Sequence, residues 1–238
     1  MVLALNLGFP RIGAKRELKK ATERYWKGEI SRDDLLKVGK ELRLANWKTQ
    51  QAAGIPYVPV NDFSFYDQML DMTCLLGAVP ERYNWDGSTI DLDTYFAMAR
   101  GRQQGGQDVV AMEMTKWFDT NYHYIVPELS AETHFKLSST KVFDHYDEAR
   151  REGVEGLPVL IGPVTYLSLA KSKNESFDPV SLIEKITPIY IEALKKLQEM
   201  GASWVQLDEP CLCLDLTPAQ KQAYTKAYTA IKDALPDL

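Results

Sequence analysis

Basic side chains gather in the first thirty residues of this chain, directly after a predicted turn. Residues 8–13 (GFPRIG) lead into a segment that carries Arg16, Lys19 and Lys20. The spacing of three and four residues places these three side chains on one face of a helix. The N-terminus of a helix also presents free N–H groups and the positive end of the helix dipole. The pattern is compatible with an anion-binding site and with an ordinary solvated helix face.

The composition is that of an ordinary globular protein with an acidic balance. The 238 residues include 28 Lys and Arg against 33 Asp and Glu, which gives a formal net charge of −5. A nucleic-acid-binding domain usually has a basic surface, so we expect no nucleic-acid partner. No segment approaches the roughly 18 apolar residues that span a bilayer, and the chain start lacks the order of a signal peptide. We therefore expect a cytoplasmic protein with no membrane partner.

Three cysteines, Cys74, Cys211 and Cys213, are too few for a disulfide framework. The Cys-x-Cys spacing has no further Cys or His close by, which makes it a poor zinc motif. We expect these residues to pack in the interior and predict no metal ligands in this chain.

Apolar runs alternate with amphipathic segments along the sequence. This alternation predicts a loop over residues 105–108, main strands at residues 3–7, 55–60, 158–161 and 204–207, and weaker strands at 109–115 and 121–126. It predicts helices at residues 15–27, 31–53, 65–76, 95–102, 142–152 and 179–200, and a last helix from Pro218. Ser31 and Thr217 are the expected N-caps.

Polar residues follow several of the predicted strands, among them Arg11, Asn61, Asp62, Asp208 and Glu209. A strand, a polar strand end and then a helix is the repeating unit of parallel β/α folds. No Gly-x-Gly-x-x-Gly follows a strand, which favours a barrel over a doubly wound sheet. A complete barrel has eight units and we count about five. We therefore predict an α/β fold, a partial (β/α)8 barrel of parallel strands, with residues 1–238 as one truncated barrel domain.

Five motifs stand in an order that resembles the N-terminal half of cobalamin-independent methionine synthase, a 5-methyltetrahydropteroyltriglutamate–homocysteine methyltransferase. They are GFPRIG with RELKK (residues 8–20), NDFSFYD (61–67), KWFDTNYHY (116–124), GPVTYL (162–167) and QLDEP (206–210). The resemblance implies a two-barrel enzyme that uses no cobalamin. Its C-terminal barrel holds the catalytic zinc and homocysteine, and its N-terminal barrel helps to hold the polyglutamated folate. The chain stops before the zinc ligands, so we expect no catalytic residue in it and no activity from it alone.

The resemblance also implies which residues contact the folate. Arg16 and Lys19 match one contact segment, and Lys116 and Asn121 match a second. A triglutamate tail is a polyanion, for which cations and amide donors are suitable partners. Asp208 and Glu209 are adjacent on an extended chain and point to opposite sides, so we expect a structural role at the barrel mouth and not a catalytic carboxylate pair.

Two other functions fit parts of the sequence. The basic helix would also suit a stand-alone polyanion-binding module without catalysis, and the strand-end acids Asp62 and Asp208 would suit a barrel hydrolase. A barrel that lacks strands exposes sheet edges and apolar interior, so we also expect the chain to associate with itself or to be marginally stable.

Overall fold

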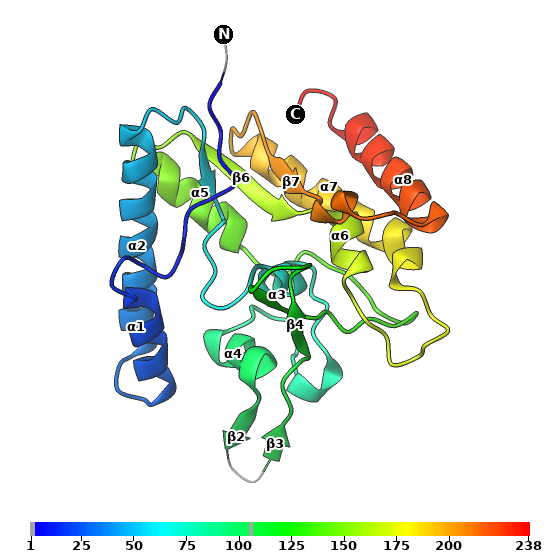
Figure 1. Ribbon diagram of the computed structural model, residues 1–238, viewed down its shortest axis with the longest axis horizontal. Helices are drawn as coiled ribbons and strands as arrows, with labels where there is room; N and C mark the ends of the chain where they lie inside the picture. The colour runs from blue at the N-terminus through cyan, green and yellow to red at the C-terminus, as the bar shows by residue number, and fades with distance from the viewer. Residues whose placement is uncertain (1–2, 105–106) are drawn as a thin grey trace. The chain divides into compact units, whose positions relative to one another are not determined.

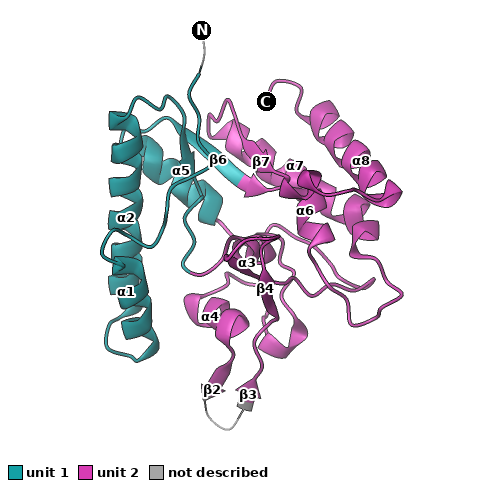
Figure 2. Ribbon diagram, in the orientation of Figure 1, with its two compact units in different colours: residues 1–65, 141–159 teal, residues 66–140, 160–238 magenta. Residues whose placement is uncertain are grey.

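Residues 3–104 and 107–238 are described by a computed structural model, in which helices and strands alternate along the chain (Figure 1). The chain divides into two units, coloured separately in Figure 2. Unit 1 comprises Met1–Phe65 and Lys141–Val159, and unit 2 comprises Tyr66–Thr140 and Leu160–Leu238. Because each unit is built from two separate stretches of sequence, each depends on pairing between distant segments.

Unit 1 is built from helices that pack around strand β1. Its elements are α1 (Glu17–Trp26), α2 (Arg32–Ala52), β1 (Val58–Val60) and α5 (Lys141–Arg151). Helix α1 packs against α2, and both α2 and α5 pack against β1. Ser31 caps α2 in a capping box with Asp34, which confirms the predicted N-cap.

A buried ion pair joins α2 to α5 inside unit 1. The Nε of Arg43 lies 2.8 Å from Oε2 of Glu148, and the two side chains are 10% and 16% exposed. The Arg43 guanidinium also lies 5.3 Å from the centre of the Phe63 ring. If only one partner of such a nearly buried pair is removed, the other charge stays buried without a partner, and the protein loses much of its stability.

The central strand β6 (Gly156–Ile161) is buried along its whole length. Within unit 1, Val58, Pro59 and Val60 of β1 pair in parallel with Gly156, Leu157 and Pro158. Within unit 2, β7 (Gln206–Asp208) follows β6 in the sheet order β1-β6-β7, and Gly162 N–H donates to the Asp208 carbonyl at 2.7 Å.

The second part of unit 2 is helical. It contains α6 (Pro163–Ser168), η2 (Pro179–Leu182), α7 (Ile183–Glu199), η3 (Pro210–Cys213) and α8 (Pro218–Ala234). Helix α7 packs against α6 and α8. The buried Tyr190 of α7 donates its hydroxyl proton to the Ile161 carbonyl at 2.6 Å, which fixes α7 to the end of β6. Thr217 caps α8 with Pro218 in the first turn, as predicted.

The first part of unit 2 holds two short antiparallel hairpins and the helices beside them. The elements are α3 (Gln68–Leu75), η1 (Glu81–Tyr83), α4 (Leu92–Arg100), β2 (Arg102–Gln104), β3 (Gln107–Val109), β4 (Met114–Lys116) and β5 (His123–Ile125). β2 pairs with β3 and β4 pairs with β5. Helix α3 packs against β5 and α4.

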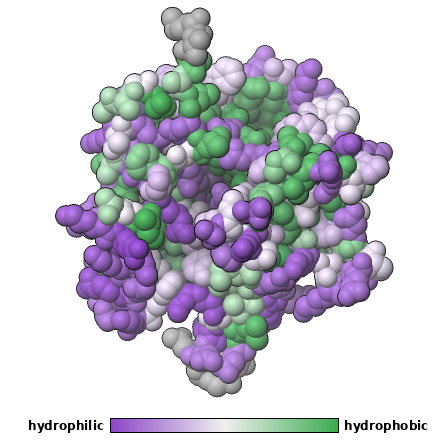
Figure 3. Space-filling model, in the orientation of Figure 1, coloured by the Kyte–Doolittle hydropathy of each residue, from purple (hydrophilic) through white to green (hydrophobic). Residues whose placement is uncertain are grey.

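The prediction of a strand at residues 3–7 is wrong. Among the residues that the structure describes, no backbone–backbone hydrogen bond involves this segment. Leu3, Leu5 and Leu7 are 54%, 55% and 82% exposed. The apolar run has the composition of a buried strand, but a strand forms only where another strand pairs with it. The green area beside the grey chain start in Figure 3 marks this apolar segment.

The predicted α/β fold with a parallel sheet is confirmed, but the count of about five strands is too high, because within residues 3–104 and 107–238 the larger sheet consists of β1, β6 and β7. The weak strands predicted at 109–115 and 121–126 contribute to β3, β4 and β5, which are antiparallel. Of the predicted loop over 105–108, residues 105–106 lie outside the described residues, and Gln107 begins β3. Helix α6 directly follows Gly162, where the sequence predicted only a break.

Candidate functional site

The basic segment forms a tight turn followed by helix α1. Arg16 is the N-cap residue in the left-handed region, with φ of 61°, and its N–H donates to the Gly13 carbonyl at 3.1 Å. Leu18 N–H reaches back to the Ile12 carbonyl at 3.1 Å. Glu17 accepts from the Lys15 N–H at 2.9 Å, and backbone hydrogen bonds lower the pKa of its carboxyl. This turn holds Arg16 at the positive end of the helix dipole.

Of the three basic residues predicted on one helix face, Lys19 and Lys20 lie in α1, whereas Arg16 is the N-cap residue that precedes it. Arg16, Lys19 and Lys20 are all exposed. Lys19 Nζ lies 3.7 Å from Oε1 of Glu23, one turn further along the helix. Within residues 3–104 and 107–238, Arg16 makes no side-chain hydrogen bond or ion pair. Its guanidinium is therefore available to an anion, while Lys19 is shared with an internal carboxylate.

Polar residues at the end of β1 hold the turn that precedes α1. Phe9 N–H donates to Oδ2 of Asp62 at 2.8 Å, and Arg11 Nη1 donates to the Ser64 carbonyl at 3.2 Å. Burial raises the pKa of Asp62, and the Phe9 N–H and the Lys141 charge oppose that rise. Asp62 thus positions the chain that enters the basic helix, a role the sequence did not reveal.

Lys116 and Asn121 lie on the β4–β5 hairpin of unit 2. Lys116 is the last residue of β4, opposite His123, and Asn121 lies in the connecting turn. Both side chains are exposed, and within the described part of the chain neither has a side-chain hydrogen bond or ion pair. The turn is closed by the Trp117 N–H, which donates to the Tyr122 carbonyl at 2.7 Å. Arg16 and Lys19 belong to unit 1, so the structure places the four residues as two pairs.

Aromatic rings cover the Trp117 side chain within the hairpin. Phe118, Tyr122 and Tyr124 meet Trp117 edge to face, with ring centres 5.1, 6.5 and 5.5 Å away. Phe118 is in the left-handed region with φ of 50°. Tyr124 is buried and donates its hydroxyl proton to the Leu169 carbonyl at 3.1 Å. The rings pack against one another and stiffen the turn that carries Asn121.

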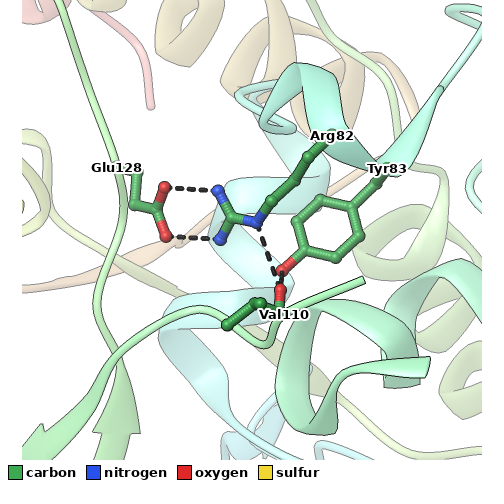
Figure 4. A network of polar contacts seen from close by, with 4 residues as sticks. All are labelled: Arg82, Tyr83, Val110 and Glu128. Atoms are coloured by element: carbon green, nitrogen blue, oxygen red, sulfur yellow. Dashed lines mark hydrogen bonds and ion pairs between the residues drawn. The ribbon is translucent and has the colours of Figure 1, made fainter. Parts of the chain in front are cut away.

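A bidentate ion pair holds the base of this hairpin (Figure 4). The two terminal nitrogens of Arg82 each lie 2.6 Å from a carboxylate oxygen of Glu128, and Arg82 Nε donates to the Val110 carbonyl at 3.1 Å. Tyr83 donates its hydroxyl proton to the same carbonyl at 2.7 Å. Hydrogen bonding to Glu128 raises the pKa of Arg82. Because Val110 precedes β4 and Glu128 follows β5, Arg82 fixes the two chain segments that meet at the base of the hairpin.

Glu209 has a structural role, and the side chain of its neighbour Asp208 has a different hydrogen-bond partner. Glu209 accepts from the N–H groups of Val164 and Thr165 at 3.0 and 2.6 Å, and from the Tyr228 hydroxyl at 3.0 Å. Asp208 instead accepts from Gln206 Nε2 at 2.7 Å. Glu209 therefore compensates the positive end of α6, and the two carboxylates do not act as a pair.

The described residues do not fit a metal site. No group of three or more His, Cys, Asp or Glu side chains among residues 3–104 and 107–238 is placed to hold an ion. Cys74, Cys211 and Cys213 are free thiols; Cys74 and Cys211 are buried as expected, but Cys213 is exposed, so the expectation of interior packing is wrong for Cys213. In the same part of the chain, every helix is too short or too polar to cross a bilayer.

Comparisons with known proteins match the whole described chain. A family model described as "Cobalamin-independent synthase, N-terminal domain" matches residues 3–238. A 5-methyltetrahydropteroyltriglutamate–homocysteine methyltransferase of Salinibacter ruber is 54% identical over 239 residues, which cover 98% of this chain and 31% of the relative. The enzyme of the same name from Flavobacterium johnsoniae is 55% identical over 234 residues and 30% of its length. The chain thus spans about a third of the length of these curated relatives.

Solved structures share the fold at low sequence identity. A B12-independent methionine synthase from Shewanella sp. W3-18-1, in complex with selenomethionine, matches with a TM-score of 0.56 and 16% identity, over 88% of this chain and 51% of that one. A putative vitamin-B12-independent methionine synthase from Listeria monocytogenes matches with a TM-score of 0.54 and 14% identity, over 93% of this chain and 57% of that one.

Proposed function

The chain belongs to the cobalamin-independent synthase family, and on this premise we propose that it binds folate polyglutamate for methyl transfer. The whole enzyme transfers the methyl group of 5-methyltetrahydropteroyltri-L-glutamate to homocysteine and releases methionine. This chain binds the glutamate tail through Arg16, Lys19, Lys116 and Asn121. The observation that carries the proposal is the exposure of all four side chains, since only Lys19 among them has an internal partner in the described residues.

The chemistry of the four residues suits a string of carboxylates. The planar Arg16 guanidinium offers a bidentate fork, and the two lysines offer mobile point charges. Asn121 adds an amide that both donates and accepts. Each contact replaces water at an exposed site, so each contributes about 0.2–1 kcal/mol, and the affinity comes from their sum.

The remaining chemistry belongs to residues outside this chain. The homocysteine site and the zinc that would hold the homocysteine sulfur as a thiolate would lie in the C-terminal barrel, and no cobalamin takes part. This chain would be a partial (β/α)8 barrel, inactive alone and cytoplasmic. The parallel pairing of β1 with β6 supports the barrel assignment.

Titration of the chain with mono- and triglutamyl 5-methyltetrahydrofolate tests the proposal. Lys19→Ala and Lys116→Ala should each weaken triglutamate binding about two- to fivefold, the equivalent of about 0.5–1 kcal/mol, and leave monoglutamate binding unchanged. Lys40→Ala removes an exposed charge from α2 and serves as the matched control. Equal effects of all three substitutions, or no preference for the triglutamate, would reject the tail assignment.

The exposed leucines support a second partner, another copy of this chain. Leu3, Leu5 and Leu7 alternate along a segment that has no strand partner among the described residues, and such a segment pairs readily with another strand. Self-association would therefore weaken when Leu5→Lys places a charge in this strip. Sedimentation that shows the same monomer at all concentrations for both proteins would contradict it. Asp62 and Asp208 accept hydrogen bonds within their own units, so no observation favours a hydrolase.

A further inference from the structure

Asp67 is a buried carboxylate that the resemblance leaves without a role. It is only 1% exposed and ends the NDFSFYD motif, directly before helix α3. Its Oδ2 accepts from the Leu70 N–H at 2.9 Å and from the Ile125 N–H at 3.0 Å. Its Oδ1 accepts from the Tyr122 hydroxyl at 2.7 Å. One carboxylate therefore joins the first turn of α3, strand β5 and the hairpin turn, all within unit 2.

The hairpin needs such an attachment. β4 and β5 have three residues each and, among the described strands, pair only with one another; an isolated two-stranded hairpin is marginally stable in water. Arg82 fixes its base, but the turn that holds Asn121 lies at the opposite end. Of the three groups that Asp67 accepts from, Tyr122 is the one that lies in this turn region, one residue from Asn121.

We propose that Asp67 is a positioning residue, which fixes the β4–β5 hairpin on α3 and thereby orients Lys116 and Asn121 toward the folate tail. The positioning rests on hydrogen-bond geometry and does not need a negative charge. The Tyr122 hydroxyl can donate to a carboxylate or accept from a protonated acid or an amide. In either case Oδ2 still accepts hydrogen bonds from the N–H groups of Leu70 and Ile125.

The surroundings of Asp67 explain why hydrogen bonds that form in both protonation states of its carboxyl are useful. Burial raises the pKa of Asp67 to about 6, and the Asp71 charge adds to the rise. Tyr95 of α4 accepts from the Asp67 N–H at 3.2 Å and donates to Asp71 Oδ1 at 2.8 Å. Burial, with smaller contributions from the charges of Glu113 and Asp67, raises the pKa of Tyr124 of β5. Because the carboxyl titrates close to neutral pH, the hairpin stays attached in both protonation states only if Tyr122 can reverse its hydrogen bond.

The test combines three substitutions in the intact 238-residue chain. Asp67→Ala removes all three contacts, and Asp67→Asn keeps their geometry without the charge. Asp91→Ala is the matched control, since Asp91 caps α4 through the Thr94 N–H and has no bond to the hairpin among the described contacts. Hydrogen–deuterium exchange of residues 114–125 reports the hairpin directly, and the triglutamate dissociation constant reports its consequence.

We expect Asp67→Ala to raise hairpin exchange at least tenfold and weaken triglutamate binding about fivefold, while Asp67→Asn and Asp91→Ala stay within twofold of the unsubstituted chain. If Asp67→Ala does not fold, Tyr122→Phe removes only the turn contact and should raise exchange about threefold. The inference would be overturned if hairpin exchange were the same in Asp67→Ala as in Asp91→Ala. It would also be overturned if exchange were the same in Tyr122→Phe as in the unsubstituted chain. Only the folate part of the inference rests on the proposed function. If hairpin exchange becomes faster but the triglutamate affinity does not change, Asp67 still positions the hairpin, and the contact between the hairpin and the folate is rejected.

Discussion

In the proposed binding mode Glu23 competes with the folate tail for Lys19, so the removal of Glu23 should strengthen binding. The Lys19 Nζ lies 3.7 Å from Glu23 Oε1, and both side chains are about half exposed. Glu23→Gln removes the carboxylate and keeps the size of the side chain. Lys19 then no longer has to leave an internal partner before it contacts the tail, and one negative charge near the tail disappears.

The expected gain follows from two small contributions. An exposed ion pair one helical turn apart, such as Lys19 with Glu23, contributes about 0.3–0.5 kcal/mol. In Glu23→Gln this pair is absent, so binding of the tail no longer has to break it. A tail carboxylate about 7 Å from Glu23 is repelled by about 0.6 kcal/mol in water before screening by salt. Salt screening reduces the second contribution, so together they amount to about 0.5–1 kcal/mol, and triglutamate should bind about two- to fivefold more tightly.

The assay is calorimetric titration of the chain with triglutamyl 5-methyltetrahydrofolate at low and high salt. Glu41→Gln is the matched control, because Glu41 pairs with Lys37 one turn away at 4.0 Å on α2 and changes the net charge equally. The gain should shrink at about 0.5 M salt, where exposed charges are screened within a few ångströms. Equal gains from both variants, or weaker binding by Glu23→Gln, would refute the reasoning.

Three further predictions concern stability. Arg43→Ala should lower the free energy of unfolding by about 3–5 kcal/mol in urea titration, because it leaves Glu148 nearly buried without its partner, and a much smaller loss would contradict the role of this pair. His145 is buried, and desolvation holds its pKa well below the usual 6.5; the unfolded chain therefore takes up the proton first, and stability should fall as pH drops below about 6.5. His145→Leu should flatten that pH dependence in thermal melts, and an unchanged profile would exclude His145 as its cause. Gly162→Ala should lower the melting temperature by several degrees, because its Cβ would occupy the space filled by the Glu209 carboxylate, and an unchanged melt would show that Glu209 can move aside.

Helix positions could be predicted because their signals are local. Ser31 with Asp34 and Thr217 with Pro218 each form a cap within four residues, and the structure confirms both. Strand pairing depends on distant segments, which a single sequence does not specify. The apolar run at residues 3–7 has no partner in the described chain, and the weak strands before and after Asn121 pair with one another in antiparallel fashion.

The sequence predicts the residues of the candidate site that would contact the ligand, but not the residues that hold them in place. Arg16, Lys19, Lys116 and Asn121 come from motif resemblance, and their exposure agrees with a binding role. Asp62 and Asp67 belong to the NDFSFYD motif. The hydrogen bonds that they accept from Phe9 and Ile125, however, join residues more than fifty positions apart. Contacts of this kind appear only when the chain is folded.

The Arg82 side chain fixes one end of the β4–β5 hairpin. Its guanidinium grips the strand entering at Val110 and the strand leaving at Glu128, so this end is immobilised by three bonds (Figure 4). The opposite end is attached as well, because the Tyr122 hydroxyl donates to Asp67 at 2.7 Å. Bending of the hairpin is therefore smallest near these two attachments, one of which lies one residue from Asn121.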